Sequence, residues 1–279
     1  MINGEAFSSI DFVGQCLVDK ERTQAFEQEI SGIQNLSEKT VLDIGTGSGV
    51  LALIAARCGA KKVYAIEYDP FVAAIAQKNI DLNKFNSVIE ILHGDARTLS
   101  LSGLHFDVVI AEMLTTGLVE EHQVEAMNNL QEQGVVDENT IFLPSKQSMS
   151  MELVSYNNKQ HGVSFDFPVH LWKWHDWSDF QIQNMSENKE VSTVFLNKIN
   201  SMETILETSL KIIGDGEVNG LIIRGKTHFP SGAIIEDTEA LNAPILLPIN
   251  PQNLKIGDSL KFKLSYSFGK GFDFFKIDI

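Results

Sequence analysis

The sequence predicts an α/β domain built on a parallel sheet, followed by a mainly β domain. Two observations carry this prediction. In the first half of the chain, short apolar segments alternate with helical ones, which is the order of βαβ units. In the second half, turn residues separate short strand-like segments. We therefore expect an N-terminal helical segment over residues 1–35, an α/β domain over 36–145 and a β-rich, barrel-like domain over 146–279.

Local patterning supports each element of this arrangement. Residues 12–30 mix apolar and charged positions without Pro, which predicts one helix that ends near Ser31. Continuous apolar segments predict strands of a parallel sheet that is covered on both faces. These segments are residues 40–44, 62–67, 88–92 and 106–111, with helices expected over 50–58 and 71–82. The strand-like segments of the second domain include residues 221–224, 259–267 and 272–279.

The composition favours a soluble, cytoplasmic protein with a sizeable core. Hydrophobic residues make up 43% of the 279 residues, and no apolar run approaches the length of a membrane span. Residues 1–10 lack the order of a signal peptide. Cys16 and Cys58 belong to no CxxC motif, as expected of free thiols in a reducing compartment. The formal net charge is -15 without a basic cluster, so we expect neither nucleic acid nor membrane as a partner.

A glycine-rich loop follows the first predicted strand. Gly45, Gly47 and Gly49 permit a tight turn, and the helix that follows offers free amide groups. The dinucleotide fingerprint G-x-G-x-x-G is not met, because the third glycine comes one residue early. Asp43 precedes the first glycine by two residues, which favours S-adenosyl-L-methionine over NAD as the ligand of a Rossmann-like domain. The alternative is a glycine turn that serves only helix–strand packing.

Acidic residues after the next two strands fit the same nucleoside. Glu67 ends the second strand, where a carboxylate can accept hydrogen bonds from both ribose hydroxyls. Asp95 follows the third strand and can accept from the adenine amine, while the backbone of Ala96 can meet the adenine ring. An ordinary turn aspartate is the alternative for Asp95.

Two glutamates lie beside this crevice. Glu112 runs off the fourth strand, and in such sheets ligands bind at the carboxyl ends of strands. Glu121 follows nine residues later, a spacing that resembles the "double-E" loop of the protein arginine methyltransferases. This resemblance implies that Glu112 and Glu121 together hold a guanidinium. The alternative is that Glu120 and Glu121 are merely the charged start of a surface helix.

The resemblance continues on both sides of this loop. Residues 16–23, Cys-Leu-Val-Asp-Lys-Glu-Arg-Thr, are similar to the family's M-L-x-D-x-x-R-T segment. The similarity implies that Arg22 pairs with the carboxylate of S-adenosylmethionine and that Asp19 faces the active site. Residues 141–145 resemble the family segment that leads into a C-terminal β-barrel.

Departures from the family pattern concern the substrate more than the cofactor. The family's Thr-His-Trp motif corresponds to residues 241–244, which contain neither His nor Trp, and a family glutamate near adenine corresponds to Arg97. Family dimers use a helical arm in the barrel domain. The Trp-rich segment around Trp172 either replaces that arm in a homodimer or has another role.

These features predict an enzyme that transfers a methyl group from S-adenosylmethionine to nitrogen and releases S-adenosylhomocysteine, without a metal. The expected acceptor is a guanidinium or another cationic nitrogen that the paired glutamates hold, in a protein or in a small molecule. One alternative is a methyltransferase of the same fold that acts on another amine, including one in a ribosomal protein. A non-catalytic nucleoside-binding module is an alternative of another class, and the glycine spacing argues against an NAD oxidoreductase.

Overall fold

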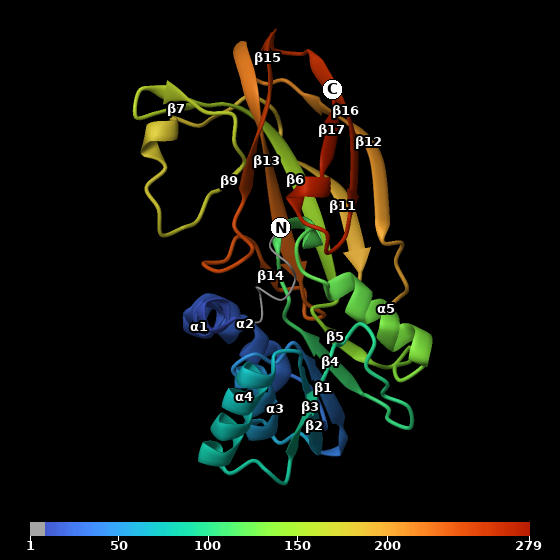
Figure 1. Cartoon of the computed structure of the whole chain (residues 1–279). Helices are drawn as coiled ribbons and strands as arrows, with labels where there is room; N and C mark the ends of the chain where they lie inside the picture. The colour runs from blue at the N-terminus through green and yellow to red at the C-terminus, as the bar shows by residue number, and fades with distance from the viewer. Residues whose placement is uncertain (1–8) are drawn as a thin grey trace.

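The computed structural model describes residues 9–279, so the first eight residues of the predicted 1–35 segment lie outside it. The chain forms an α/β unit and a β-rich unit, with two N-terminal helices close to the junction between them (Figure 1). No helix in the described part of the chain is long and apolar enough to span a membrane.

The α/β unit is built on a five-stranded sheet with the order β3-β2-β1-β4-β5, in which every neighbouring pair is parallel. Its strands are β1 (Thr40–Ile44), β2 (Lys62–Glu67), β3 (Ile89–His93), β4 (Val108–Ala111) and β5 (Ile141–Leu143). The first four lie within about two residues of the predicted segments. The fifth strand is short, and the sequence pattern did not identify it as part of this sheet.

Helices cover both faces of the sheet, as the continuous apolar strands require. Val41 of β1 belongs to the apolar cluster that includes α2 and α3, whereas Leu42 and Ile44 face the opposite side with α5. Figure 1 shows α3 and α4 on one side of the strands and α5 on the other. The helices are α1 (Ile10–Val18), α2 (Lys20–Ser31), α3 (Val50–Arg57), α4 (Pro70–Asn83) and α5 (Gln123–Gln133), with one-turn 3₁₀ helices η2 (Leu36–Glu38) and η3 (Thr116–Leu118).

The β-rich unit consists mainly of antiparallel strands that curl around a shared core. Its larger sheet runs β10-β6-β13-β15-β9, with β11 paired to β6 and β14 to β13, and the smaller one runs β12-β16-β17. The larger sheet comprises β6 (Lys146–Ser155), β9 (Val169–His170), β10 (Gln183–Asn184), β11 (Lys189–Phe195), β13 (Gly216–His228), β14 (Ile234–Ile235) and β15 (Ile245–Leu254). The others are β12 (Glu203–Lys211), β16 (Ser259–Ser267), β17 (Lys276–Asp278) and the hairpin of β7 (Lys159–Gln160) and β8 (Val163–Ser164), together with 3₁₀ helices η4 (Ser178–Phe180) and η5 (Phe272–Phe274). The predicted strand over 272–279 is therefore wrong in its first part, which is η5.

The single predicted helix over 12–30 is wrong, because it breaks at Asp19. This residue ends α1 and caps α2, since its Oδ1 accepts a hydrogen bond from the backbone N–H of Arg22 at 3.1 Å. Its Oδ2 accepts from the backbone N–H groups of Glu239 and Ala240 in the β-rich unit, at 2.9 and 3.3 Å. Asp19 thus attaches the N-terminal helices to the second unit.

Replacing this attachment should destabilise the protein. We expect Asp19→Ala to lower the free energy of unfolding by about 3 kcal/mol, because it removes a helix cap and leaves buried N–H groups without their charged acceptor. Urea unfolding at pH 7 measures the change. Asp11→Ala, at an exposed position of α1, is the matched control and should change stability by less than about 1 kcal/mol. Equal losses in the two variants would contradict the role assigned to Asp19.

Candidate active site

The glycine-rich loop between β1 and α3 has a left-handed backbone at each glycine. The φ angles of Gly45, Gly47 and Gly49 are 67°, 54° and 82°, a region that glycine enters without steric strain. A Cβ at Gly45 would lie 3.1 Å from Cγ of Met113, so the loop also closely approaches the segment after β4. Residues of this loop line a cavity of about 750 Å³ between the two units of the chain.

Asp43 holds the glycine loop in place from the end of β1. Its Oδ2 accepts hydrogen bonds from Oγ1 of Thr46 at 2.6 Å and from the backbone N–H of Ala52 at 3.1 Å. Burial raises the pKa of Asp43 to about 6, with a contribution from the Glu67 carboxylate, although both hydrogen bonds act in the opposite direction. Asp43 borders the cavity, but its carboxylate already organises the loop and the start of α3.

Glu67 connects the second strand to the same loop. Its Oε2 accepts from the backbone N–H of Gly47 at 2.8 Å, and its Oε1 accepts from that of Asp69 at 3.0 Å. The side chain is buried and lines the cavity. The carboxylate therefore lies beside the loop at the carboxyl end of β2, where the sequence pattern expected the acid that binds ribose.

Asp95 and Ala96 line the cavity after β3, but the Asp95 carboxylate is engaged with Arg97. Nε and Nη2 of Arg97 donate to its two oxygens at 2.6 to 3.0 Å. These hydrogen bonds are the main reason that the pKa of Asp95 is lowered. Arg97, the position where the family pattern has a glutamate, thus fixes the orientation of the acid predicted to meet adenine.

Arg22 pairs with Glu112 at the wall of the cavity. The residue is 1% exposed, and Nη2 of its guanidinium forms an ion pair with Oε1 of Glu112. Its Nη1 donates to the backbone carbonyl of Ala240 at 2.9 Å. The sequence resemblance assigned Arg22 to the cofactor carboxylate, and in the structure its guanidinium also orients the first of the two predicted acceptor glutamates.

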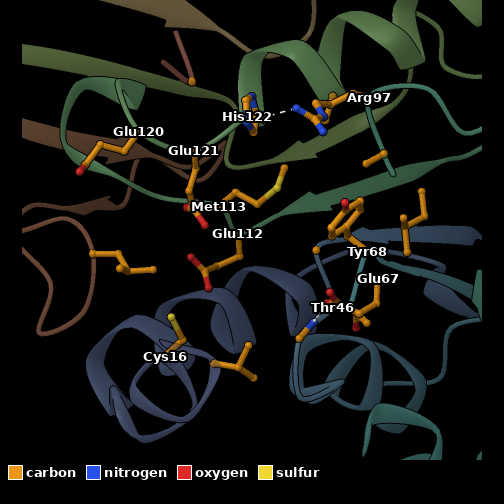
Figure 2. A pocket seen from close by; sticks show the side chains of 18 of the residues that line it. Cys16, Thr46, Glu67, Tyr68, Arg97, Glu112, Met113, Glu120, Glu121 and His122 are labelled. Carbon is orange, nitrogen blue, oxygen red and sulfur yellow. Dashed lines mark hydrogen bonds between the residues drawn. The ribbon is translucent and has the colours of Figure 1, made fainter. Parts of the chain in front are cut away.

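The loop after β4 folds back so that Glu121 reaches the cavity. Gly117 and Leu118 have φ of 66° and 57°, which turns the chain within η3. The backbone N–H of Gly271 donates to Val119 O at 2.9 Å and fixes the loop against the β-rich unit. In Figure 2 the carboxylates of Glu112 and Glu121 point toward one another. The interpretation of Glu121 as a surface residue at a helix start is therefore wrong.

Burial leaves the Glu121 carboxylate without a full set of partners. The residue is 9% exposed, and within residues 9–279 its Oε2 has no hydrogen-bond partner. Burial is the main reason that its pKa rises from 4.5 to about 7; Glu120 adds to the rise and Arg22 opposes it. A buried carboxylate without a paired cation favours a ligand that brings positive charge.

The loop after β4 and the β-rich unit both bring to the cavity residues that sequence reasoning did not assign to the site. Glu120 and His170 both line it, with Oε2 of Glu120 3.7 Å from Nε2 of His170. Phe272 lines the cavity from η5. The position of Glu120 next to Glu121 in the sequence could have indicated that it belongs to the site. His170 could not be found in this way, because it lies some 50 residues further along the chain and only the tertiary structure brings it to Glu120.

The structure shows where Asp19 and residues 241–244, two parts of the family pattern, lie relative to the cavity. Asp19 does not line the cavity, because its carboxylate is buried against the backbone of Glu239 and Ala240. Residues 241–244 lack His and Trp, yet Pro244 O accepts a hydrogen bond from the N–H of Leu171 at 2.7 Å. The Trp-rich segment therefore lies beside this stretch and contributes His170 to the cavity.

A parallel sheet with a glycine loop after β1, an acid at the end of β2 and a cavity at the strand ends defines the class I S-adenosylmethionine-dependent methyltransferases. Residues 23–161 match the family model described as ribosomal protein L11 methyltransferase (PrmA). The chain is 34% identical over 263 residues to the uncharacterized protein MJ1452 of Methanocaldococcus jannaschii, covering 94% of each chain. The chain belongs to the same family as this archaeal protein and is a methyltransferase similar to the protein arginine methyltransferases.

Further comparisons support the fold. Protein arginine N-methyltransferase 1.1 of Arabidopsis thaliana is 28% identical over 208 residues, which are 73% of this chain and 51% of that protein. The chain thus aligns with about half the length of this relative. The structure of the Trypanosoma brucei PRMT1 enzyme–prozyme complex with AdoHcy superposes with a TM-score of 0.76 at 20% identity, covering 93% of this chain and 88% of the other. Arabidopsis thaliana protein arginine methyltransferase 10 gives a TM-score of 0.75 at 20% identity, with 94% and 89% covered.

The raised pKa of Glu121 predicts a pH-dependent stability. The pKa of Glu121 is higher in the folded protein than in the unfolded chain. The contribution of its protonated carboxyl to the free energy of unfolding is therefore fully present below about pH 4.5 and is lost as the pH rises through about 7. Glu121→Gln resembles the protonated form at every pH. We expect the free energy of unfolding of the variant to exceed that of the unmodified protein by an amount that grows from pH 5 to pH 8, up to about 3 kcal/mol.

Urea unfolding of the ligand-free proteins at both pH values measures this gain. Glu132→Gln, at an exposed position of α5, is the matched control and should show no such change. A stability difference for Glu121→Gln that is the same at pH 5 and pH 8 would mean that the Glu121 carboxyl ionises at its ordinary pKa.

Proposed function

We propose that this protein transfers the methyl group of S-adenosylmethionine to a cationic nitrogen, with a guanidinium as the leading acceptor. The observation that carries the proposal is that the carboxylates of Glu112 and Glu121 point toward one another in a cavity that the glycine loop also lines. The acceptor belongs to a protein or to a small molecule. A ribosomal-protein amine is the second candidate, favoured by the family model that matches residues 23–161.

The residues around the glycine loop fit the cofactor. The left-handed glycines leave the loop backbone without side chains, and Glu67 places a buried carboxylate beside it. Glu67 would accept hydrogen bonds from the ribose hydroxyls, Asp95 and Ala96 would border the adenine, and Gly45 and Gly47 would face the rest of the nucleoside. Arg22 would meet the cofactor carboxylate. The cofactor supplies a methyl group on a positively charged sulfur, and the protein need only orient the acceptor and stabilise charge.

The two glutamates perform three tasks on the acceptor. Two carboxylates can hold a planar guanidinium by paired hydrogen bonds, which orients one nitrogen toward the methyl group. They draw positive charge away from that nitrogen and so favour its attack. The methylated nitrogen then loses a proton, and the pKa of Glu121 near 7 suits this carboxylate to accept it.

Cofactor binding tests the first half of the proposal. We expect S-adenosylhomocysteine to bind and NAD not to bind in calorimetric titrations. Glu67→Ala should weaken binding of S-adenosylhomocysteine about 10- to 100-fold, since a hydrogen bond to a charged group contributes roughly 1.5–3 kcal/mol. Glu90→Ala on β3, where the side chain is half exposed, is the control and should leave the affinity unchanged. Tight NAD binding without any response to S-adenosylhomocysteine would reject the proposed cofactor.

Turnover tests the second half. Glu112→Gln and Glu121→Gln should each reduce methyl transfer at least about 100-fold, because each removes a charge from the place where positive charge is stabilised. Glu121→Gln should leave the affinity for S-adenosylhomocysteine within about twofold, and the double variant should be little worse than either single one. The assay follows labelled methyl transfer to arginine peptides, free arginine, simple amines and ribosomal protein.

The best acceptor in this panel decides between the two candidates. Transfer to a ribosomal-protein amine, with arginine compounds inactive, would favour the second candidate. Full activity of Glu121→Gln on the best acceptor would remove the paired glutamates from the mechanism.

A further inference from the structure

Glu120 brings a third carboxylate to the part of the cavity that faces the acceptor. It leaves the same turn as Glu121 but points in a different direction, away from the facing pair of Glu112 and Glu121 (Figure 2). Its side chain is 16% exposed and lines the cavity. Burial raises its pKa to about 7.

The groups around Glu120 are aromatic and electrically neutral near pH 7. Its nearest basic neighbour is His170, at 3.7 Å, and burial lowers the pKa of that imidazole. The His170 ring stacks on Trp172 with a centroid distance of 5.0 Å and meets the edge of Phe272 at 5.9 Å. Phe272 and Phe274 line the same cavity. Such rings attract a cation through their faces, so they favour the same ligand charge as the carboxylate.

One cationic nitrogen would pair with only some of the glutamates that line this part of the cavity. Arg22 pairs with Glu112, which leaves the carboxylates of Glu121 and Glu120. The Glu121 carboxylate is nine-tenths buried, and its Oε2 lacks a hydrogen-bond partner within residues 9–279. A cation held by Glu112 and Glu121 would satisfy that oxygen and leave Glu120 uncompensated. A second positive group on the ligand beside Glu120 would favour the ionised carboxylate inside the cavity.

We propose that Glu120, with the rings of His170 and Phe272, forms a second cation subsite, so that the acceptor is a small molecule with two cationic groups. One group is methylated between Glu112 and Glu121, either a guanidinium that loses a proton after the attack or an amine that has lost its proton before it, and the other group binds at Glu120. This inference rests on the proposed function. A small acceptor is favoured because the C-terminal segment closes over the loop, where Gly271 N–H donates to Val119 O.

A matched pair of ligands tests the second subsite. 4-Aminobutylguanidine and pentylguanidine have the same length and differ only in an ammonium in place of a methyl group. With S-adenosylhomocysteine bound, we expect the unmodified protein to bind 4-aminobutylguanidine at least tenfold more tightly than pentylguanidine, as measured by calorimetry. Glu120→Gln should reduce this preference to near onefold, Glu120→Asp should restore part of it, and Glu132→Gln, the exposed control, should keep it in full.

The outcomes separate this inference from the proposed function. If the unmodified protein binds both guanidines equally and Glu120→Gln changes neither affinity, the second subsite is wrong while the Glu112–Glu121 pair stands. If a protein that binds S-adenosylhomocysteine binds neither guanidine, the paired glutamates fail and the subsite fails with them. Tighter binding of a peptide with adjacent Arg and Lys than of 4-aminobutylguanidine would overturn the small-molecule assignment. The ligand comparison on the unmodified protein decides the matter even if Glu120→Gln does not fold.

Discussion

The buried guanidinium of Arg22 connects the three parts of the molecule. It belongs to α2, forms an ion pair with Glu112 after β4, and donates to the carbonyl of Ala240 in the β-rich unit. Taking a cation out of water costs several kcal/mol, so the buried guanidinium needs the carboxylate of Glu112 and the carbonyl of Ala240 as partners. This requirement fixes how the N-terminal helices approach the sheet. It also fixes the direction of Glu112, so the same contact supports the fold and prepares the cavity.

The carboxylates of Glu120 and Glu121 differ from that of Glu112, because neither forms an ion pair with Arg22. Glu120 and Glu121 are held where burial raises each pKa to about 7, although the Arg22 guanidinium opposes the rise at Glu121. Apolar side chains of similar size would fill such positions at a lower free-energy cost. Strongly perturbed carboxylates that gather in one cavity are characteristic of functional sites. The stability lost by burying these groups therefore indicates a ligand that returns positive charge to them.

The sequence predicted those parts of the fold and site that depend on neighbours along the chain. The continuous apolar strands, the glycine loop and Glu67 follow from local spacing, and the structure has them near the expected positions. The break at Asp19 was missed because its carboxylate accepts from Glu239 and Ala240, 220 and 221 residues further along the chain. The pairing of Glu120 with His170 was missed for the same reason, since a sequence pattern does not show which loop of a β-rich unit closes a cavity.

The proposed reaction brings two positive groups into contact, and the acidic cavity makes this possible. A cationic acceptor and a sulfonium about 4 Å apart repel each other by about 4 kcal/mol at an effective dielectric constant of 20. Carboxylates on the acceptor side offset this repulsion before any bond changes. After methyl transfer the sulfur is neutral, and the product nitrogen gives up a proton. A carboxylate with the ordinary pKa of 4.5 is a weak base for that proton, whereas burial gives Glu121 a pKa of about 7 and makes it a stronger one. Burial of Glu121 destabilises the ligand-free protein, but it suits this carboxylate to two steps of the proposed reaction. The carboxylate first attracts the cationic acceptor and then accepts the proton that the methylated nitrogen releases.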